Sequence, residues 1–416
     1  MIKVVDDSSI TDSIIDRFLT YTRFWTTSDR NSEITPSSQG QWDLARHLVN
    51  ELNSLGLKDV ILTDNCYVIA RLPATKGKET HPAIAFMAHL DTSDDVSGKD
   101  VKARLVKEYD GKKITLAEGY ALDPDNDPDL AAQKGKTIIH TDGTTLLGAD
   151  DKAGIAEIMT AVEYLLSHTD IGHGAVEIIF TPDEETGKGL PHFPINRIIS
   201  KVCYTLDGGR VGEIEIACFN AYKAEINFNG IAIHLGYARG IMANAVLMAV
   251  SFANMLPRSE SPEATDGYYG YYCVTNIEGS IENASLVCYM RDFEKNGIER
   301  RIAALENFAK AVETQFPGGK VTVNTKPQYL NMKEKIDARP EVTDRLKKAM
   351  DNLGISYFLK PIRGGTDGSR LTELGIPTPN IFTGGRNWHS RIEWVSVPEM
   401  TTACQVIIEL VKLWGN

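Results

Sequence analysis

Three short segments of the chain carry residues that could bind metal ions. They are Met87-Ala88-His89-Leu90-Asp91, Gly148-Ala149-Asp150-Asp151-Lys152 and Thr181-Pro182-Asp183-Glu184-Glu185. We expect each to lie at the end of an apolar strand or at the turn before a helix. Imidazole nitrogens and carboxylate oxygens are the ligands that zinc and similar ions take in proteins. These residue types therefore predict a metal-dependent hydrolase.

Two further candidate ligands, Asp207 and His389, follow apolar runs later in the chain. In an open α/β sheet, ligands gather beyond the carboxyl ends of the strands, so we expect all the candidates to meet there. Five nitrogen and oxygen ligands fit two metal ions that share one carboxylate, with an open position for water on each ion. The candidate metal ligands are His89, Asp150, Glu185, Asp207 and His389.

Asp150 is the candidate for the shared ligand, because a helix follows it at once and Gly148 allows the backbone to turn. Asp91 should point the same way as His89, since residues two apart on an extended chain share a face. There its carboxylate could accept the second imidazole N–H and fix the tautomer.

Glu184 and Glu185 are adjacent and cannot both face one metal ion from an extended backbone. One could bind the ion while the other accepts a proton from the attacking water. The residues alone leave open which does which. They also leave open a structural or interaction protein without a metal site, because an acidic pair before a helix often serves as a cap.

Apolar runs alternate with helical patterns around these candidates. Alternation of this kind predicts an α/β fold, with a mainly parallel mixed sheet covered by helices on both faces. The polar stretch 93–145 suits turns and loops. Strands are predicted at 84–88, 176–181 and 202–206, and helices near 11–25, at 41–55, at 152–168 and near 400–413.

The pattern changes between about residues 215 and 327, where the order of predicted elements is βαββαβ. This order is that of a ferredoxin-like unit, here inserted into the first domain. The predicted domains are therefore 1–214, 215–327 and 328–416, the outer two forming one domain. Strands are predicted at 221–228, 271–278, 284–291 and 320–325, and helices at 241–256 and 298–316.

Bulk composition narrows the class of protein. The 44 Lys and Arg against 56 Asp and Glu give a net charge of −12, which argues against nucleic acid as a partner. No apolar run is long enough to span a bilayer, and Met1–Ser8 lacks the features of a signal peptide. Six scattered cysteines without a Cys-x-x-Cys pair suggest reduced thiols, so a cytoplasmic location is expected.

As a set, the motifs resemble the two-zinc peptidases, a family that includes aminoacylases and glutamate carboxypeptidases. Within that family they are most similar to the tripeptide aminopeptidases of the peptidase T branch. The similarity runs over nearly the whole chain. It rests on Gly40-Gln41-Trp42, Met87 to Thr92, Thr141-Asp142-Gly143, Leu146 to Gly154, Phe180 to Glu185, Asp207-Gly208-Gly209, Pro361 to Gly368 and Phe382 to Gly385.

The resemblance implies that the five candidates bind two zinc ions, bridged by Asp150, with cobalt or manganese as substitutes. It assigns Glu184 as the general base and Asp91 as the partner of His89. It also implies a cis peptide between Asp150 and Asp151. The inserted domain would be the family's lid, through which two copies could form a homodimer.

The resemblance further implies that the substrate contacts His234, Asn244, Arg291 and Arg363. An Arg fork suits the terminal carboxylate of a peptide, although Arg291 could instead form a surface ion pair. The family usually has Pro after the lid His and Tyr before the last ligand, where this chain has Leu235 and Trp388. We expect these two departures to alter the shape of the pocket and to leave activity intact.

The predicted function is hydrolysis of the N-terminal residue from short peptides, above all tripeptides. The alternatives within the family are a dipeptidase, an aminoacylase or a carboxypeptidase. An alternative of another class is a non-catalytic protein that binds peptides or metal.

Overall fold

The computed structural model describes residues 7–416. Most of Met1–Ser8, which is predicted not to be a signal peptide, lies outside the described residues. The chain forms two compact units. The large unit runs to Ile216 and continues over Glu334–Lys360 and Thr366–Asn416. The inserted unit comprises Ala217–Lys333 and Pro361–Gly365.

The short segment Pro361–Gly365 had been predicted to belong to the outer domain. It joins the inserted unit because Ile362 forms a parallel bridge with Cys218 and donates its backbone N–H to the carbonyl of Ala217 at 2.8 Å.

The main sheet of the large unit has eight strands in the order β1-β2-β8-β3-β9-β16-β10-β15. Its central strands β8, β3, β9 and β16 run parallel, whereas β2 pairs with β8 antiparallel. The strands are β1 (Asp59–Leu62), β2 (Val68–Leu72), β3 (Ile84–His89), β8 (Val176–Thr181), β9 (Cys203–Gly208), β10 (Glu213–Glu215), β15 (Phe358–Leu359) and β16 (Asn380–Phe382).

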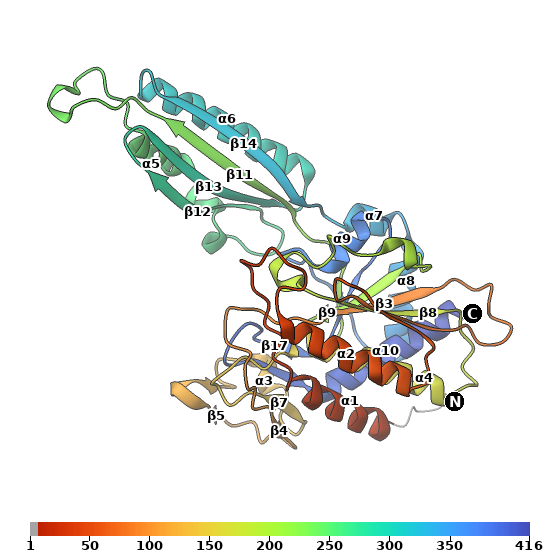
Figure 1. Ribbon diagram of the computed structural model, residues 1–416. Coiled ribbons are helices and arrows are strands. Elements are labelled where there is room, and N and C mark those ends of the chain that lie inside the picture. The colour runs from red at the N-terminus through yellow and green to blue at the C-terminus, as the bar shows by residue number, and fades with distance from the viewer. Residues whose placement is uncertain (1–6) are drawn as a thin grey trace. The chain divides into compact units, whose positions relative to one another are not determined.

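Helices cover both faces of this sheet (Figure 1). On one face, Met87 of β3 belongs to an apolar cluster with Leu371 of α9. On the other face, Phe86 stacks on Tyr204, whose hydroxyl donates to a carbonyl of α8. The predicted α/β fold is therefore confirmed. The helices of the large unit are α1 (Asp7–Tyr21), α2 (Gln39–Ser54), α3 (Pro128–Ala131), α4 (Ala149–Ser167), α7 (Lys333–Asp337), α8 (Pro340–Asn352), α9 (Asp367–Glu373) and α10 (Val397–Trp414).

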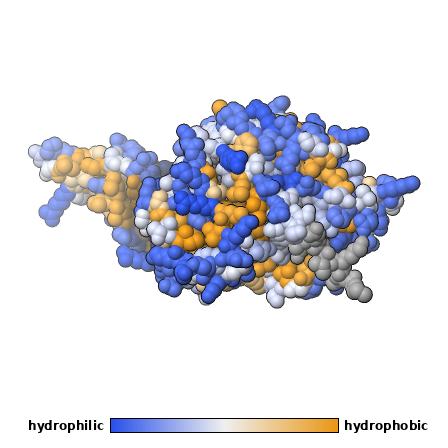
Figure 2. Space-filling view, turned by 90° about the horizontal axis from the view of Figure 1, so that it is seen from below, coloured by the Kyte–Doolittle hydropathy of each residue, from blue (hydrophilic) through white to orange (hydrophobic). Residues whose placement is uncertain are grey.

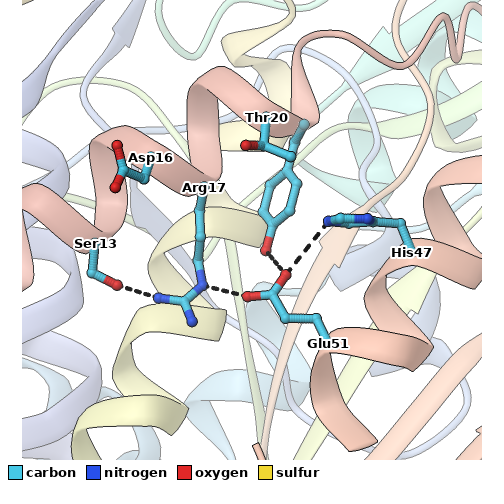
Figure 3. Close-up of a pocket in the computed structure, with 7 residues that line it drawn as sticks. Ser13, Asp16, Arg17, Thr20, His47 and Glu51 are labelled. Carbon is cyan, nitrogen blue, oxygen red and sulfur yellow. Dashed lines mark hydrogen bonds and ion pairs between the residues drawn. The ribbon is translucent and has the colours of Figure 1, made fainter. Parts of the chain in front are cut away.

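A polar network lines a pocket of about 330 Å³ between α1 and α2 (Figure 3). Arg17 donates to Glu51 at 2.6 Å and to Glu163 at 2.7 Å, and Tyr21 donates to Glu51 at 2.6 Å. Two carboxylates thus neutralise the one arginine of the pocket. The network connects α1 to both α2 and α4.

The polar stretch 93–145 contains more regular structure than the predicted turns and loops. It supplies two strands of a second, four-stranded sheet in the order β17-β18-β7-β4, and a separate hairpin, β5-β6. A small apolar cluster that includes Leu130 and Trp394 holds this region together. The strands are β4 (Arg104–Val106), β5 (Ile114–Thr115), β6 (Ala121–Leu122), β7 (Ile138–His140), β17 (Gly385–Arg386) and β18 (Trp394–Ser396).

The inserted unit has the predicted βαββαβ order, and its sheet is antiparallel throughout in the order β12-β13-β11-β14. The predicted helix 241–256 starts later than expected. It begins at Ala245, because the Asn244 side chain caps it by accepting the N–H groups of Val246 and Leu247. The elements are β11 (Asn220–Asn229), α5 (Ala245–Met255), β12 (Tyr271–Gly279), β13 (Asn283–Asp292), α6 (Lys295–Gln315) and β14 (Lys320–Tyr329).

Between residues 7 and 416, no helix combines the length and apolar character needed to cross a membrane. On the face drawn in Figure 2, hydrophobic residues gather in patches between hydrophilic ones.

Candidate metal centre

The candidate ligands lie on five segments of the large unit that converge at one edge of the main sheet. His89 is the last residue of β3, and Asp207 lies within β9 near its end. Glu185 follows β8, Asp150 precedes the regular part of α4, and His389 follows β17. Parallel neighbours β8, β3 and β9 end at the same edge, which is why residues so far apart in sequence meet.

Asp150 lies between two histidines. Its Oδ1 is 2.9 Å from Nε2 of His89, and its Oδ2 is 3.4 Å from Nε2 of His389. Beyond it, His89 Nε2 is 3.7 Å from Asp207 Oδ1, and His389 Nε2 is 3.0 Å from Glu185 Oε1. Each oxygen of Asp150 thus faces one pair of a histidine and a carboxylate, and all five predicted ligands come together.

The backbone at this point has an unusual form. The peptide bond between Asp150 and Asp151 is cis, as the resemblance implied. The Asp151 side chain is buried, and its Oδ2 accepts the backbone N–H of His89 at 3.1 Å. Asp151 therefore binds the backbone of β3, which carries His89, while Asp150 faces the imidazoles of His89 and His389.

The pKa values of these groups are shifted because the groups are partly buried and lie close to one another. Burial, together with the charge of Asp150, raises the pKa of Glu185 to about 8 and that of Asp207 to about 6. Burial also acts to raise the pKa of Asp150, but hydrogen bonds from His389 and His89 outweigh it and bring that pKa below its ordinary value. Hydrogen bonds to Asp150 and Glu185 raise the pKa of His389 to about 11.

A cluster of largely buried carboxylates and imidazoles is suited to divalent cations, which stabilise the deprotonated forms of all these groups. Ligand atoms of His89, Asp150 and Glu185 lie within 4.8 Å of one another, and so do those of His89, Asp151 and Asp207. In addition, Oδ1 of Asp151 is buried without a hydrogen-bond partner among the described residues. The donor set therefore fits metal ions.

Asp91 connects His89 to the turn that follows β8. Nδ1 of His89 is 3.1 Å from the backbone carbonyl of Asp91 and 3.3 Å from its Oδ1. The same carboxylate accepts the backbone N–H groups of Glu184 at 3.0 Å and Glu185 at 3.1 Å. Burial raises the pKa of the half-buried Glu184 well above its usual range.

Several acids that shape this centre were not predicted from the sequence. Glu393 accepts backbone N–H groups from the turn before Asp150. Asp183 accepts from Ser37 and Gln41, which fixes the turn before Glu184. Asp95 lies 2.9 Å from Nδ1 of His389. No local pattern marks these acids, because each acts on a segment remote in the chain.

Comparison with known proteins identifies the family. Residues 139–413 match the model of peptidase family M20/M25/M40. Peptidase T of Clostridium perfringens (strain SM101) is 46% identical over 401 residues, which cover 96% of this chain and 98% of that protein. The chain belongs to this peptidase family. The predictions of a peptidase and of a resemblance to peptidase T are confirmed.

Solved structures of other peptidases share this fold. The aminopeptidase PepT from Bacillus cereus has a TM-score of 0.75 at 22% identity, covering 98% of this chain and 99% of its own. YXEP of Bacillus subtilis, described as a dinuclear metal-binding peptidase of family M20, has a TM-score of 0.67 at 15% identity and covers 98% of both chains.

The residues predicted to contact substrate all lie in the inserted unit of this M20 peptidase. His234 is exposed, and its Nδ1 accepts the backbone N–H of Gly236. The side-chain oxygen of Asn244 caps α5. Arg291 lies near the rings of Tyr289 and Tyr329, at 5.2 and 5.6 Å from their centroids.

Arg363 is engaged within the inserted unit. Its Nη1 donates to the carbonyls of Gly267 and Tyr269 at 2.9 and 2.8 Å, and its Nη2 donates to the carbonyl and hydroxyl of Thr265. The guanidinium thus holds residues 265–269 in place. Any contact with a substrate would use the N–H groups of Arg363 that do not make these bonds.

Proposed function

We propose that the chain removes the N-terminal residue from short peptides, above all tripeptides. The observation that supports this most is the position of Asp150 between the His89–Asp207 pair and the His389–Glu185 pair. One carboxylate between two such pairs suits two ions held side by side. The 46% identity to a peptidase T over nearly the whole chain supports the choice of tripeptides.

The ions are proposed to be zinc, with cobalt or manganese as substitutes. His89 and Asp207 would hold one ion, His389 and Glu185 the other, and Asp150 both. Zinc so held would polarise the scissile carbonyl and lower the pKa of the attacking water toward neutrality.

Glu184 is proposed as the general base. Its neighbour Glu185 faces His389, so Glu184 is the carboxylate of the pair left to take a proton from the attacking water. It would then deliver this proton to the leaving amine. Asp91 supports this role because it holds the backbone of both glutamates and contacts His89.

Substrate recognition is assigned to His234, Asn244, Arg291 and Arg363. Arg291 is the strongest of these candidates, because its hydrogen bonds to the backbone carbonyls of Tyr222 and Met290 both come from Nη1. Its remaining N–H groups could form a bidentate pair with a peptide's terminal carboxylate. His234 would approach the oxyanion or the substrate carboxylate.

The inserted unit is proposed to act as a lid and, between two copies, as a dimer interface. A cytoplasmic location is proposed as well. All six cysteines are free, and five of them are buried, as expected for a protein kept in a reducing compartment.

The deciding experiment combines metal analysis with a peptide assay. After dialysis, the wild-type protein should retain two zinc ions per chain and cleave a tripeptide faster than the matching di- and tetrapeptide. A chelator should abolish the activity, and zinc should restore it. Faster cleavage of an N-acylated amino acid would identify an aminoacylase, and bound zinc without turnover of any peptide would identify a binding protein.

A further inference from the structure

Glu393 makes four hydrogen bonds to consecutive backbone N–H groups. Its Oε2 accepts from Leu147 at 2.7 Å and from Gly148 at 2.9 Å. Its Oε1 accepts from Ala149 at 2.7 Å and from Asp150 at 3.3 Å. Only 1% of the Glu393 side chain is exposed, so water does not compete for these bonds.

These four N–H groups lie at the start of α4 and just before it, where the helix itself supplies no acceptor for them. The first N–H groups of any helix have no intrahelical acceptor, and together they carry a partial positive charge. Here the turn also contains Gly148 at a φ of +80° and Asp150 at a non-helical ψ of 101°. A single carboxylate satisfies the whole turn.

Glu393 also lies four residues after His389, just before β18. The bonds therefore join the segment that carries His389 to the turn that carries Asp150. These two residues face each other, with His389 Nε2 3.4 Å from Asp150 Oδ2. The spacing of two proposed ligands of one ion is thus set by a residue that contacts neither of their ligand atoms.

We propose that Glu393 is a positioning residue of the metal centre, which holds Asp150 at the distance from His389 that a shared ion requires. This inference rests on the proposed two-metal function. Loss of the Glu393 hydrogen bonds should weaken binding of the ion proposed between Asp150 and His389. Binding of the ion proposed between Asp150 and His89 should weaken less. The latter ion would be held by His89 of β3 and Asp207 of β9, which the hydrogen bonds of Glu393 do not reach.

The variant Glu393→Gln separates this role from simple filling of space. The amide has nearly the same volume as the carboxylate and keeps one oxygen for two of the four N–H groups. Its NH₂ group would face the other two N–H groups, donor against donor, so half of the turn would lose its acceptor.

The matched control is Glu399→Gln. Glu399 is another buried glutamate of the same C-terminal segment, and it accepts the backbone N–H of Val211 and a bond from Arg386. Within the described part of the chain, its hydrogen bonds go to Gln133, Val211 and Arg386 and not to the Asp150 turn. Both variants are compared with wild type for zinc content, for zinc affinity by competition with a chelator, and for kcat and KM on a tripeptide at limiting and excess zinc.

We expect Glu393→Gln to bind one of its two zinc ions about 10- to 100-fold more weakly, the range for residues that orient metal ligands. Its kcat should fall at limiting zinc and recover in large part at excess zinc, with KM little changed. Glu399→Gln should bind both ions as wild type does.

A folded Glu393→Gln with both zinc ions at wild-type affinity overturns the inference and leaves the proposed function standing. A wild-type protein without zinc overturns both. If Glu393→Gln does not fold, Glu393→Asp takes its place. It keeps the charge but is one methylene shorter, and unchanged zinc affinity in that variant overturns the inference equally.

Discussion

The carboxylate of Asp91 accepts the backbone N–H of Glu184 at 3.0 Å, although the two residues lie on different strand ends. Its second oxygen accepts the N–H of Glu185 at 3.1 Å, and its first lies 3.3 Å from Nδ1 of His89. Asp91 therefore fixes three groups at once: an imidazole, the proposed base and a proposed ligand. Its role extends beyond the tautomer of His89.

Asp91→Asn should lower kcat about 10- to 100-fold and change KM little, because the amide cannot accept both N–H groups of the glutamate turn. The measurement is steady-state kinetics on a tripeptide with excess zinc. Asp94→Asn serves as the control, since Asp94 is a partly exposed partner of Arg30 on the same segment. Equal losses in the two variants would argue against a specific role for Asp91.

Glu184→Gln should lower kcat about 10²- to 10⁴-fold, the range for loss of a general base. The variant should still bind two zinc ions, because the carboxylate beside His389 is that of Glu185. Glu185→Gln should instead lose zinc. Full turnover by Glu184→Gln, or loss of zinc from it, would contradict the assigned roles.

Arg291→Ala should raise KM for a tripeptide about 10- to 100-fold, since a hydrogen bond to a charged group contributes about 1.5–3 kcal/mol. For the same peptide with a C-terminal amide, wild type and variant should differ little. The comparison of acid and amide substrates isolates the carboxylate contact. A KM increase of the same size for both substrates would show that Arg291 does not read the carboxylate.

Glu157→Gln should make stability less dependent on pH. Glu157 lies on α4 with 0% exposure, and neither carboxylate oxygen has a hydrogen-bond partner among the described residues. Burial raises its pKa well above the ordinary 4.5, so the folded state binds the proton more tightly than the unfolded state. The resulting stability is complete below pH 4.5 and is lost as pH rises toward the folded pKa.

Urea unfolding at pH 5.5 and pH 8, at fixed zinc concentration, measures this effect. The Gln variant should gain stability over wild type as pH rises, by at most about 1.4 kcal/mol per pH unit within the window. Glu163→Gln on the same helix should lose stability, because Glu163 accepts bonds from Arg17 and Ser13. A difference between Glu157→Gln and wild type that stays constant with pH would contradict the prediction.

The sequence predicted those features that depend on local pattern. Apolar runs located β3 and β8, and helical spacing located α4, because burial imposes these periodicities on the chain. The strand ends then indicated where His89 and Asp207 would meet. Helix starts were less predictable: α5 begins at Ala245 since the Asn244 side chain, and not the apolar spacing, decides its first turn.

Contacts between segments that are far apart in the chain could not be predicted from the sequence. Glu393 looks like one acid among 56 in the sequence, and only the fold brings it under the Asp150 turn. The second sheet was missed for a similar reason. Its strands β4 and β7 are three residues each, and β7, which pairs with β4, gains its other partner β18 from the far end of the chain.

The order of these segments also bears on biosynthesis. Four proposed ligands precede the inserted unit, while His389 follows it, and β16 must enter the main sheet between β9 and β10. The ribosome therefore synthesises the whole inserted unit before it synthesises His389, the last of the proposed ligands. The nascent large unit has to wait, with its sheet open at β9, until nearly the whole polypeptide has been translated. Tight binding of the proposed metal ions should consequently begin only after nearly the whole chain has been synthesised.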